Sequence, residues 1–125
     1  MKVPKNLYYT DTHEWVKVDG DKALIGITDF AQNELGEIVF VELPEESDPV
    51  EKGEEFSAVE STKAASEIMS PVSGVIVEVN NELEEAPELL NEDPYKYWIV
   101  KIELEDESEL ETLKDADAYQ KLIEE

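Results

Sequence analysis

The sequence predicts a mainly β protein: a small, flattened sandwich of two quasi-twofold related β units, with short flanking helices and a C-terminal helical segment. Two observations predict it. Short segments rich in β-branched and aromatic residues, such as EIVFVEL and YWIVKIEL, recur along the chain between turn-forming residues. Two segments, which start at Gly36 and Gly74, also align with each other at a constant offset. Two similar units of a few strands cannot each close a core, but they can when they pack face to face.

The internal repeat is faint but regular. GEIVFVELP and GVIVEVNN place the same residue types at three positions: Ile38 with Ile76, Val39 with Val77, and Val41 with Val79. A turn and a second strand are expected after each copy, and Lys63 lies between the copies. The repeat therefore predicts that this lysine lies at one extremity of the sandwich.

The chain has 125 residues, which fits a single domain over residues 1–125. Its hydrophobic content of 41% is ordinary for a globular protein, despite a net charge of -23. We expect a core over about residues 8–104 and a helical tail over about 107–125.

The first half of the chain predicts a hairpin, a short helix and a strand. HEWVKVDGDKALIGIT (13–28) reads as two strands joined at DGD, which tolerates positive φ. Thr28 or Asp29 then offers an N-cap for the helix DFAQNEL, and Gly36 ends it. The strand EIVFVELP follows and ends at Pro44.

The second half predicts three strands, a short helix and a longer strand. EEFSAVES (54–61), ASEIMSP (65–71) and GVIVEVN (74–80) form the three strands, with Lys63 between the first two. Pro87 suits the first turn of the helix PELLN, and the strand YWIVKIEL (97–104) comes after it. In the tail, Ser108 and Glu111 have the spacing of a capping box. Apolar residues then recur as in amphipathic helices that cover the core: Leu110, Leu113, Ala116 or Ala118, Leu122 and Ile123.

Composition excludes several classes of function. The chain has 33 acidic residues against 10 lysines and no arginine, which argues against binding to nucleic acids or anionic membranes. Three explanations for the excess of acidic residues stay open: docking to basic surfaces of other proteins, simple solvation of the surface, or adaptation to a salty or hot habitat. There is no cysteine, so any redox chemistry must come from an attached group, and no metal site is predicted. No apolar run approaches a membrane span and no leader is evident, so a cytoplasmic protein is expected.

Lys63 stands out because its neighbours are small and uncharged. A hairpin tip reading Ser61, Thr62, Lys63, Ala64 places the lysine in solvent, and the two hydroxyl residues can hydrogen-bond the local backbone. An enzyme that acylates an ε-amine would meet neither bulk nor a competing salt bridge there. On spacing alone, an ordinary loop lysine is the simpler interpretation.

A longer string favours modification. ESTKAASEIMSPVSGVIVEVN resembles the attachment segment of lipoyl and biotinyl carrier domains, in which the modified lysine is followed by residues matching Glu67, Ile68, Ser70, Pro71 and Gly74. In biotin carriers methionines bracket the lysine; Thr62 and Ala64 stand there in this chain, so lipoate is favoured. The resemblance implies that the turn of Glu60, Ser61, Thr62 and Ala64 presents Lys63.

Four separated motifs resemble the glycine cleavage H-protein family, in the order and spacing of that family: YTDTHEWV, IGITDFAQNELGEIVFVELP, ESTKAASEIMSPVSGVIVEVN and PELLNEDPY. The match covers roughly residues 8–104 and implies a barrel-sandwich hybrid fold. It implies a carrier of glycine catabolism and one-carbon metabolism, not an enzyme, with no catalytic residue and with lipoate in amide linkage to Lys63.

The resemblance also implies partners. They are a pyridoxal-phosphate glycine dehydrogenase (decarboxylating), which passes an aminomethyl group to the arm, and a tetrahydrofolate-dependent aminomethyltransferase, which receives it. Dihydrolipoyl dehydrogenase reoxidises the dithiol, and a lipoate-protein ligase or octanoyltransferase attaches the group. In this family the loaded arm folds into a surface cleft, where by position Thr12, Glu14 and Glu67 would hold the amine. Ordinary surface roles for these acids stay open.

Other residues qualify the resemblance. His13 is the only histidine, and a structural or surface role is favoured over a general base, while Trp15 is expected in the core. The family often has a histidine in the helix after GIT, where this chain has Phe30 and Glu34. The link Lys96–Tyr97 before Trp98 is one residue shorter than usual, and Thr62 replaces a usual valine.

Four alternatives stay open at this point. The chain could be an H-like protein that serves lipoate relay or another sulfur or one-carbon pathway. It could be the biotin carrier of a carboxylase, or an unmodified acidic interaction module that keeps only the fold. An enzyme in its own right is the least favoured.

Overall fold

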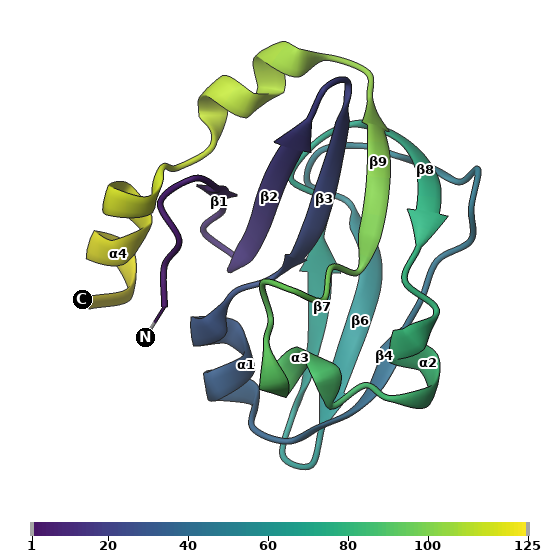
Figure 1. The fold of residues 1–125 in the computed structure, drawn as a ribbon, viewed down its shortest axis with the longest axis vertical. Helices are drawn as coiled ribbons and strands as arrows, with labels where there is room; N and C mark the ends of the chain where they lie inside the picture. Colours follow the sequence, from purple (N-terminus) through teal and green to yellow (C-terminus); the bar gives the residue numbers. More distant parts are fainter. Residues whose placement is uncertain (1, 125) are drawn as a thin grey trace.

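The computed structural model describes residues 2–124, which form two antiparallel sheets with short helices at the edges (Figure 1). The first sheet has the strand order β1-β2-β3-β9-β8-β5, with β1 (Tyr8–Tyr9), β2 (Glu14–Asp19), β3 (Lys22–Ile27), β9 (Val100–Leu104), β8 (Gly74–Val79) and β5 (Pro49–Val50). The second has the order β4-β6-β7, with β4 (Ile38–Glu42), β6 (Glu55–Ser61) and β7 (Ala65–Met69). The predicted mainly β class is confirmed.

The two copies of the internal repeat become β4 and β8, which belong to different sheets. Their paired positions have the same burial: Ile38 and Ile76 are buried, Val41 and Val79 are buried, and Val39 and Val77 are exposed. The hairpin of β6 and β7 extends to one end of the molecule, at the bottom of Figure 1, and its turn carries Lys63. The predicted placement of this lysine at an extremity therefore agrees with the fold.

The first hairpin and helix form as their residues predict. β2 and β3 pair from Glu14 opposite Ile27 to Asp19 opposite Lys22, and Gly20 takes the positive φ of 65° in the turn. Helix α1 (Asp29–Leu35) is capped by Thr28, whose Oγ1 accepts a hydrogen bond from Ala31 N–H. Gly36 ends the helix with a φ of 81°, which favours glycine.

The helix predicted around Pro87 is displaced. Helix α2 (Glu82–Glu85), which the sequence did not indicate, precedes it, and helix α3 (Leu89–Glu92) begins two residues after Pro87. Leu90 N–H donates to the carbonyl of Pro87 at 3.2 Å, an i to i+3 bond. The segment at Pro87 is therefore a tight turn that leads into the helix and not the first turn of the helix itself.

The predicted strand 97–104 is too long at its start, because β9 begins at Val100. Tyr97 N–H still bonds the carbonyl of Asp93, so the chain is turning at that point. Ile99 N–H then reaches the carbonyl of Ile25 at 2.7 Å, and the regular pairing with β3 follows.

The tail is helical, as predicted, but its cap is different. A 3-10 helix η1 (Glu107–Thr112) is capped by Asp106, whose carboxylate accepts from both N–H and Oγ–H of Ser108. Ser108 is thus a donor inside the turn and not the predicted cap residue. Helix α4 (Ala116–Glu124) follows.

Two apolar clusters hold these elements together. The main one lies between the two sheets and includes Ile25, Val59 and Ile76, all fully buried. The second lies where α4 covers the first sheet and contains Leu7, Tyr9, Trp15, Ala116 and Tyr119, with Leu122 and Ile123 packed against it. The predicted roles of Trp15 as a core residue and of the tail as core cover are confirmed.

Candidate functional site

Lys63 lies at the tip of a hairpin whose turn is fixed by Ser61. The Ser61 hydroxyl accepts hydrogen bonds from the backbone N–H groups of Lys63 (3.3 Å) and Ala64 (3.1 Å), and Ser61 N–H donates to the Ala64 carbonyl at 2.8 Å. Glu60 pairs with Ala65 at the end of the ladder. The hydrogen bonds predicted for the Ser61 hydroxyl are confirmed, and they hold the backbone of the turn that carries Lys63.

Thr62 acts through its backbone, in contrast to the predicted side-chain hydrogen bond. Its N–H donates to the carbonyl of Glu37 at 3.0 Å, and within residues 2–124 its hydroxyl has no hydrogen-bond partner. This contact ties the turn to the chain segment just before β4. Because this contact uses only the backbone N–H, which valine also has, Thr62 can stand in place of the valine usual in the family without changing the turn.

The Lys63 side chain is exposed and forms no ion pair with any residue of the described chain, 2–124. Its stem passes over Gly36, because a Cβ atom at that glycine would lie only 3.2 Å from Cε of Lys63. The glycine that ends α1 thus also leaves room for the lysine. An exposed amine without a carboxylate partner is open to acylation.

A cavity of about 240 Å³ opens beside the hairpin, between α1, β7 and the loop before β2. Ser66 and Ile68, on one face of β7, contribute to its wall, so it begins three residues after Lys63. Most of its lining is apolar, from Ile27, Phe30, Ala31, Leu35 and Ile68, and its polar lining residues are Thr12, His13, Glu34 and Ser66. We call it the arm cleft, because its walls suit a hydrocarbon chain that starts at Lys63. Phe30 and Glu34, the residues that depart from the family pattern, both line it.

Glu14 is a buried carboxylate next to Thr12, one of the residues that line the arm cleft. It is only 1% exposed and lines a second cavity of about 370 Å³, which shares Thr12 with the arm cleft. Its Oε1 accepts from the hydroxyls of Thr10 (2.6 Å) and Thr12, whereas Oε2 accepts only a long bond of 3.3 Å from Met69 N–H among the described residues. Oε2 thus retains capacity for a further donor.

Burial raises the pKa of the Glu14 carboxyl above its ordinary value, and the hydrogen bonds from Thr10, Thr12 and the Met69 backbone oppose this rise. A cation bound at Oε2 would favour the ionised form. The geometry therefore brings together the predicted pair, Thr12 and Glu14, as a site with acceptor capacity for an amine.

Glu67 does not join Thr12 and Glu14. It is exposed on β7, opposite Ala58, and it lies between Ser66 and Ile68, the two residues of β7 that face the arm cleft. Because side chains alternate along a strand, Glu67 points to the other face of the sheet. It lines neither the arm cleft nor the cavity at Glu14. The predicted contact of Glu67 with the arm is therefore not supported.

His13 lines the arm cleft and is held by the tail. Its backbone has a positive φ of 72°, and its Nδ1 lies 2.8 Å from the hydroxyl of Tyr119 in α4. Its ring also packs against Phe30, with centroids 4.7 Å apart. Burial lowers the pKa of His13, although Glu34 and Asp11 oppose this shift. These contacts agree with the structural role predicted for His13.

Tyr119 is the residue near the site that sequence reasoning missed. It is fully buried, stacks on Tyr9 with centroids 4.7 Å apart, and places its hydroxyl 2.6 Å from Oγ1 of Thr28. It thereby connects the tail to both the helix cap and His13. The amphipathic spacing of the tail places Tyr119 three residues after Ala116, and this was the only available signal.

The short link at Lys96 and Tyr97 lies away from the arm cleft. Lys96 Nζ lies over the Tyr97 ring, 5.3 Å from its centroid, and both residues line a cavity with Asn80 and Trp98. The departure from the family pattern therefore changes a different face of the molecule.

Residues 2–124 contain no group of three or more histidine or acidic side chains placed to hold a metal ion. No helix in this part of the chain is long and apolar enough to cross a membrane.

The chain is similar to proteins of one family. The family model described as "Glycine cleavage H-protein" matches residues 7–125. A glycine cleavage system H protein of Staphylococcus carnosus is 56% identical over 124 residues, covering 98% of each chain. One of Brevibacillus brevis is 55% identical over 126 residues, covering 100% of each. The crystal structure of a glycine cleavage system H protein from Mycobacterium marinum superposes with a TM-score of 0.88 at 35% identity, covering 98% of this chain and 100% of that one.

Proposed function

The chain belongs to the glycine cleavage H-protein family, and from this premise we propose that Lys63 is the residue that carries lipoate in amide linkage. The family membership itself establishes a non-catalytic carrier of the glycine cleavage system, whose members hold lipoate covalently on a lysine. The barrel-sandwich hybrid fold of the family agrees with the two sheets of this chain. Membership implies work with the decarboxylase, the aminomethyltransferase and the dihydrolipoyl dehydrogenase of that system.

The observation that carries the assignment of Lys63 is its position at the tip of a fixed turn, exposed and without an ion pair in the described chain. Attachment requires the neutral amine to attack an activated acyl carbonyl, so a carboxylate that held the ammonium would slow the reaction. We include a lipoate-protein ligase or an octanoyltransferase among the partners for this step.

The residues around Lys63 fit the group. Gly36 leaves space for the lysine stem, and the arm cleft begins three residues further along the chain with mostly apolar walls. When bound, lipoate supplies the disulfide that accepts the aminomethyl group of glycine and the redox sulfur that a chain without cysteine lacks. A covalent tether keeps the carried group at a high local concentration for each enzyme.

We propose that Glu14 and Thr12 hold the amine of the carried group. Oε2 of Glu14 has one long hydrogen bond, and Thr12 links the two cavities, so an amine at the end of the arm cleft meets a buried acceptor. A buried carboxylate attracts a cation more strongly than an exposed one. We leave Glu67 out of this proposal because it lines neither the arm cleft nor the cavity at Glu14.

The test is reconstitution with a competent glycine decarboxylase. The lipoylated protein should support exchange of labelled bicarbonate into glycine, and a Lys63→Arg protein taken through the same lipoylation should support none. A known H protein in parallel establishes that the decarboxylase is active.

The alternative role, lipoate relay, predicts a different result. If the lipoylated protein gives no exchange while the reference H protein does, the chain serves lipoate relay instead of glycine cleavage. Exchange by the Lys63→Arg protein would refute the assignment of Lys63.

A further inference from the structure

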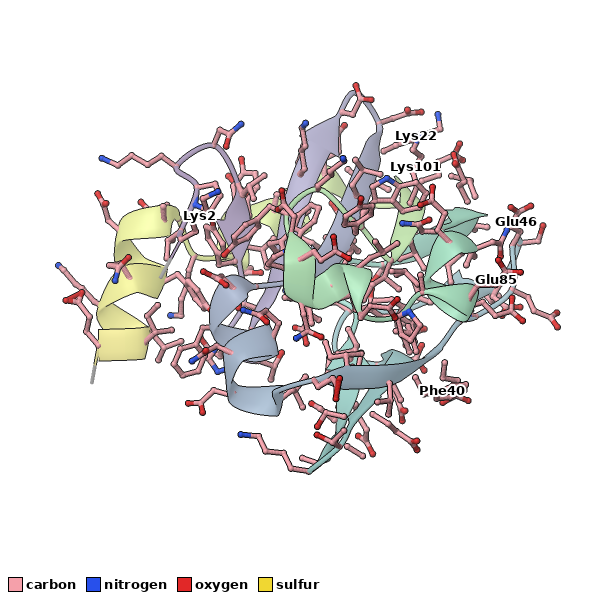
Figure 2. All side chains as sticks on the ribbon, turned by 60° about the horizontal axis from the view of Figure 1, so that its bottom comes forward. Lys2, Lys22, Phe40, Glu46, Glu85 and Lys101 are labelled. Carbon is pink, nitrogen blue, oxygen red and sulfur yellow. The ribbon has the colours of Figure 1, made fainter. Side chains whose placement is uncertain are left out.

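The surface beside Lys63 carries two consecutive apolar residues that face solvent. Val39 is 50% exposed and Phe40 is 49% exposed, both on β4. In a regular strand neighbouring side chains alternate between the faces, so one of the two would be buried. Figure 2 shows Phe40 projecting away from the ribbon.

A β-bulge explains why both side chains face outward. Ile38 pairs with Ser61 and Phe40 pairs with Glu60, so three residues of β4 lie opposite two residues of β6, and Val39 is the extra one. The repeat copy on β8 has Glu78 where β4 has Phe40. Two consecutive exposed apolar residues therefore occur in the β4 copy, whose strand pairs with the hairpin that carries Lys63, and not in the β8 copy.

The bulge lies close to the lysine. Ser61 and Glu60, its partners, come two and three residues before Lys63, which corresponds to roughly 10 Å along an extended chain. The Thr62 N–H bond to the Glu37 carbonyl fastens the turn to the same segment. A protein that binds Lys63 directly therefore has Val39 and Phe40 within reach of its contact surface.

The rim of this patch is acidic. Glu37, Glu42 and Glu60 are exposed around it, and in the described chain none of them is in an ion pair. A second copy of this chain would bring like charges together on a protein of net charge -23, which disfavours self-association. An apolar centre with a charged rim instead fits a partner that has an apolar pocket bordered by lysine or arginine.

We propose that Val39 and Phe40, with the acidic rim of Glu37, Glu42 and Glu60, form the docking site for the enzyme that acylates Lys63. This inference rests on the proposed attachment at Lys63. The acylating enzyme must bring its activated carbonyl within bonding distance of Nζ. Nζ forms an amide bond to that carbonyl, the bond from the carbonyl to its activating group breaks, and the neutral amine gives up one proton, so one N–H remains on the amide. The enzymes of the cleavage cycle meet the end of a long arm, so they can dock further away.

The test measures in vitro acylation of the unmodified protein by a purified lipoate-protein ligase with lipoate and ATP. The Val39→Thr/Phe40→Thr protein has β-branched residues, which suit a strand, at both positions, and its KM as the protein substrate should be about tenfold or more higher than that of the wild type, with little change in kcat. The matched control is Val75→Thr/Val77→Thr, since these residues are also exposed apolar residues, on β8 of the other sheet. Its KM should match that of the wild type, and thermal unfolding should show that both variants fold.

The acidic rim gives an independent measurement. The value of kcat/KM for the wild type should fall as salt concentration rises, and this dependence should be weaker in Glu37→Gln/Glu42→Gln.

Two results would overturn the docking site. The first is an unchanged KM of the ligase for Val39→Thr/Phe40→Thr while Lys63 is still acylated; a raised KM of the decarboxylase for the same variant would then assign the patch to that enzyme. The second is a wild-type dimer in sedimentation that Phe40→Thr dissociates, which would assign the patch to a second copy. Failure of the proposed function is distinct, because the mass of the wild-type product would then show no acyl group on Lys63.

Discussion

The hydroxyl of Tyr119 lies 2.6 Å from Oγ1 of Thr28, a residue 91 positions earlier in the chain, and 2.8 Å from Nδ1 of His13. Thr28 Oγ1 already accepts from Ala31 N–H. Every hydroxyl proton has an acceptor if Thr28 donates to Tyr119 and Tyr119 donates to His13. The C-terminal helix thereby sets the position of a wall of the arm cleft and the orientation of its histidine.

Tyr119→Phe should destabilise the protein by about 1–3 kcal/mol, because it removes one hydroxyl and leaves the buried hydroxyl of Thr28 without its acceptor. Urea unfolding measures this loss. Tyr8→Phe is the control, because Tyr8 is 37% exposed, and it should change stability by less than about 0.5 kcal/mol. Equal effects of the two substitutions would contradict the network.

The pH dependence of stability should report the burial of Glu14. Because its folded-state pKa is raised, the folded protein binds this proton more readily than the unfolded chain, and stability is lost as pH rises through the folded pKa. Glu14→Gln removes this loss. The stability of Glu14→Gln relative to the wild type should therefore increase as the pH rises above 4.5, the ordinary pKa of this carboxyl, and should level off once the pH exceeds the raised folded-state pKa.

Glu67→Gln serves as the control for that experiment, because it removes the same charge from an exposed position. Urea unfolding at each pH gives the difference in the free energy of unfolding between each variant and the wild type. This difference should change less with pH for Glu67→Gln than for Glu14→Gln. If the two difference curves run parallel, only the overall negative charge matters and the burial of Glu14 does not.

Much of the fold was predictable because it depends on local pattern. The hairpin at Gly20, the helix between Thr28 and Gly36 and the turn at Lys63 all follow from turn residues, caps and alternation. Two local predictions were wrong: Ser108 as the cap of the tail helix and Pro87 in the first turn of a helix. Asp106 offers a competing hydrogen-bond acceptor two residues before Ser108, and the chain at Pro87 adopts a tight turn instead.

The parts that could not be predicted depend on contacts between distant segments. The left-handed backbone of His13 is fixed by Tyr119 and Phe30, and the exposure of Phe40 depends on a bulge that only the pairing with β6 reveals. The orientation of Glu67 depends on which face of β7 packs against α1, and position in the sequence alone does not indicate that face.

Glu14 should also govern the lifetime of the carried group. Glu14→Gln keeps the volume of the side chain but removes its charge, so release of ammonia from the loaded arm should be faster by about tenfold or more. The extent of lipoylation should be unchanged, because Glu14 is buried away from the turn that carries Lys63. Faster release from Glu67→Gln, with no change in Glu14→Gln, would refute the proposed amine site.

Gly74 should be intolerant of any side chain. A Cβ at this position would lie 2.0 Å from the carbonyl oxygen of Glu103 and 2.7 Å from Cγ2 of Ile102, at the point where β8 pairs with β9. Gly74→Ala should therefore cost more than about 2 kcal/mol in urea unfolding. Gly20→Ala, where a Cβ meets nothing within 4 Å, should cost only about 1 kcal/mol for its positive φ. The reverse order would contradict the close packing at Gly74.

The most direct test of the central claim is the intact mass of the protein isolated from its native host, with peptide mapping around Lys63. The claim predicts a lipoyl adduct on Lys63 and on no other lysine. A biotin adduct, an adduct on a different lysine, or an unmodified Lys63 in cells that lipoylate other proteins would contradict it.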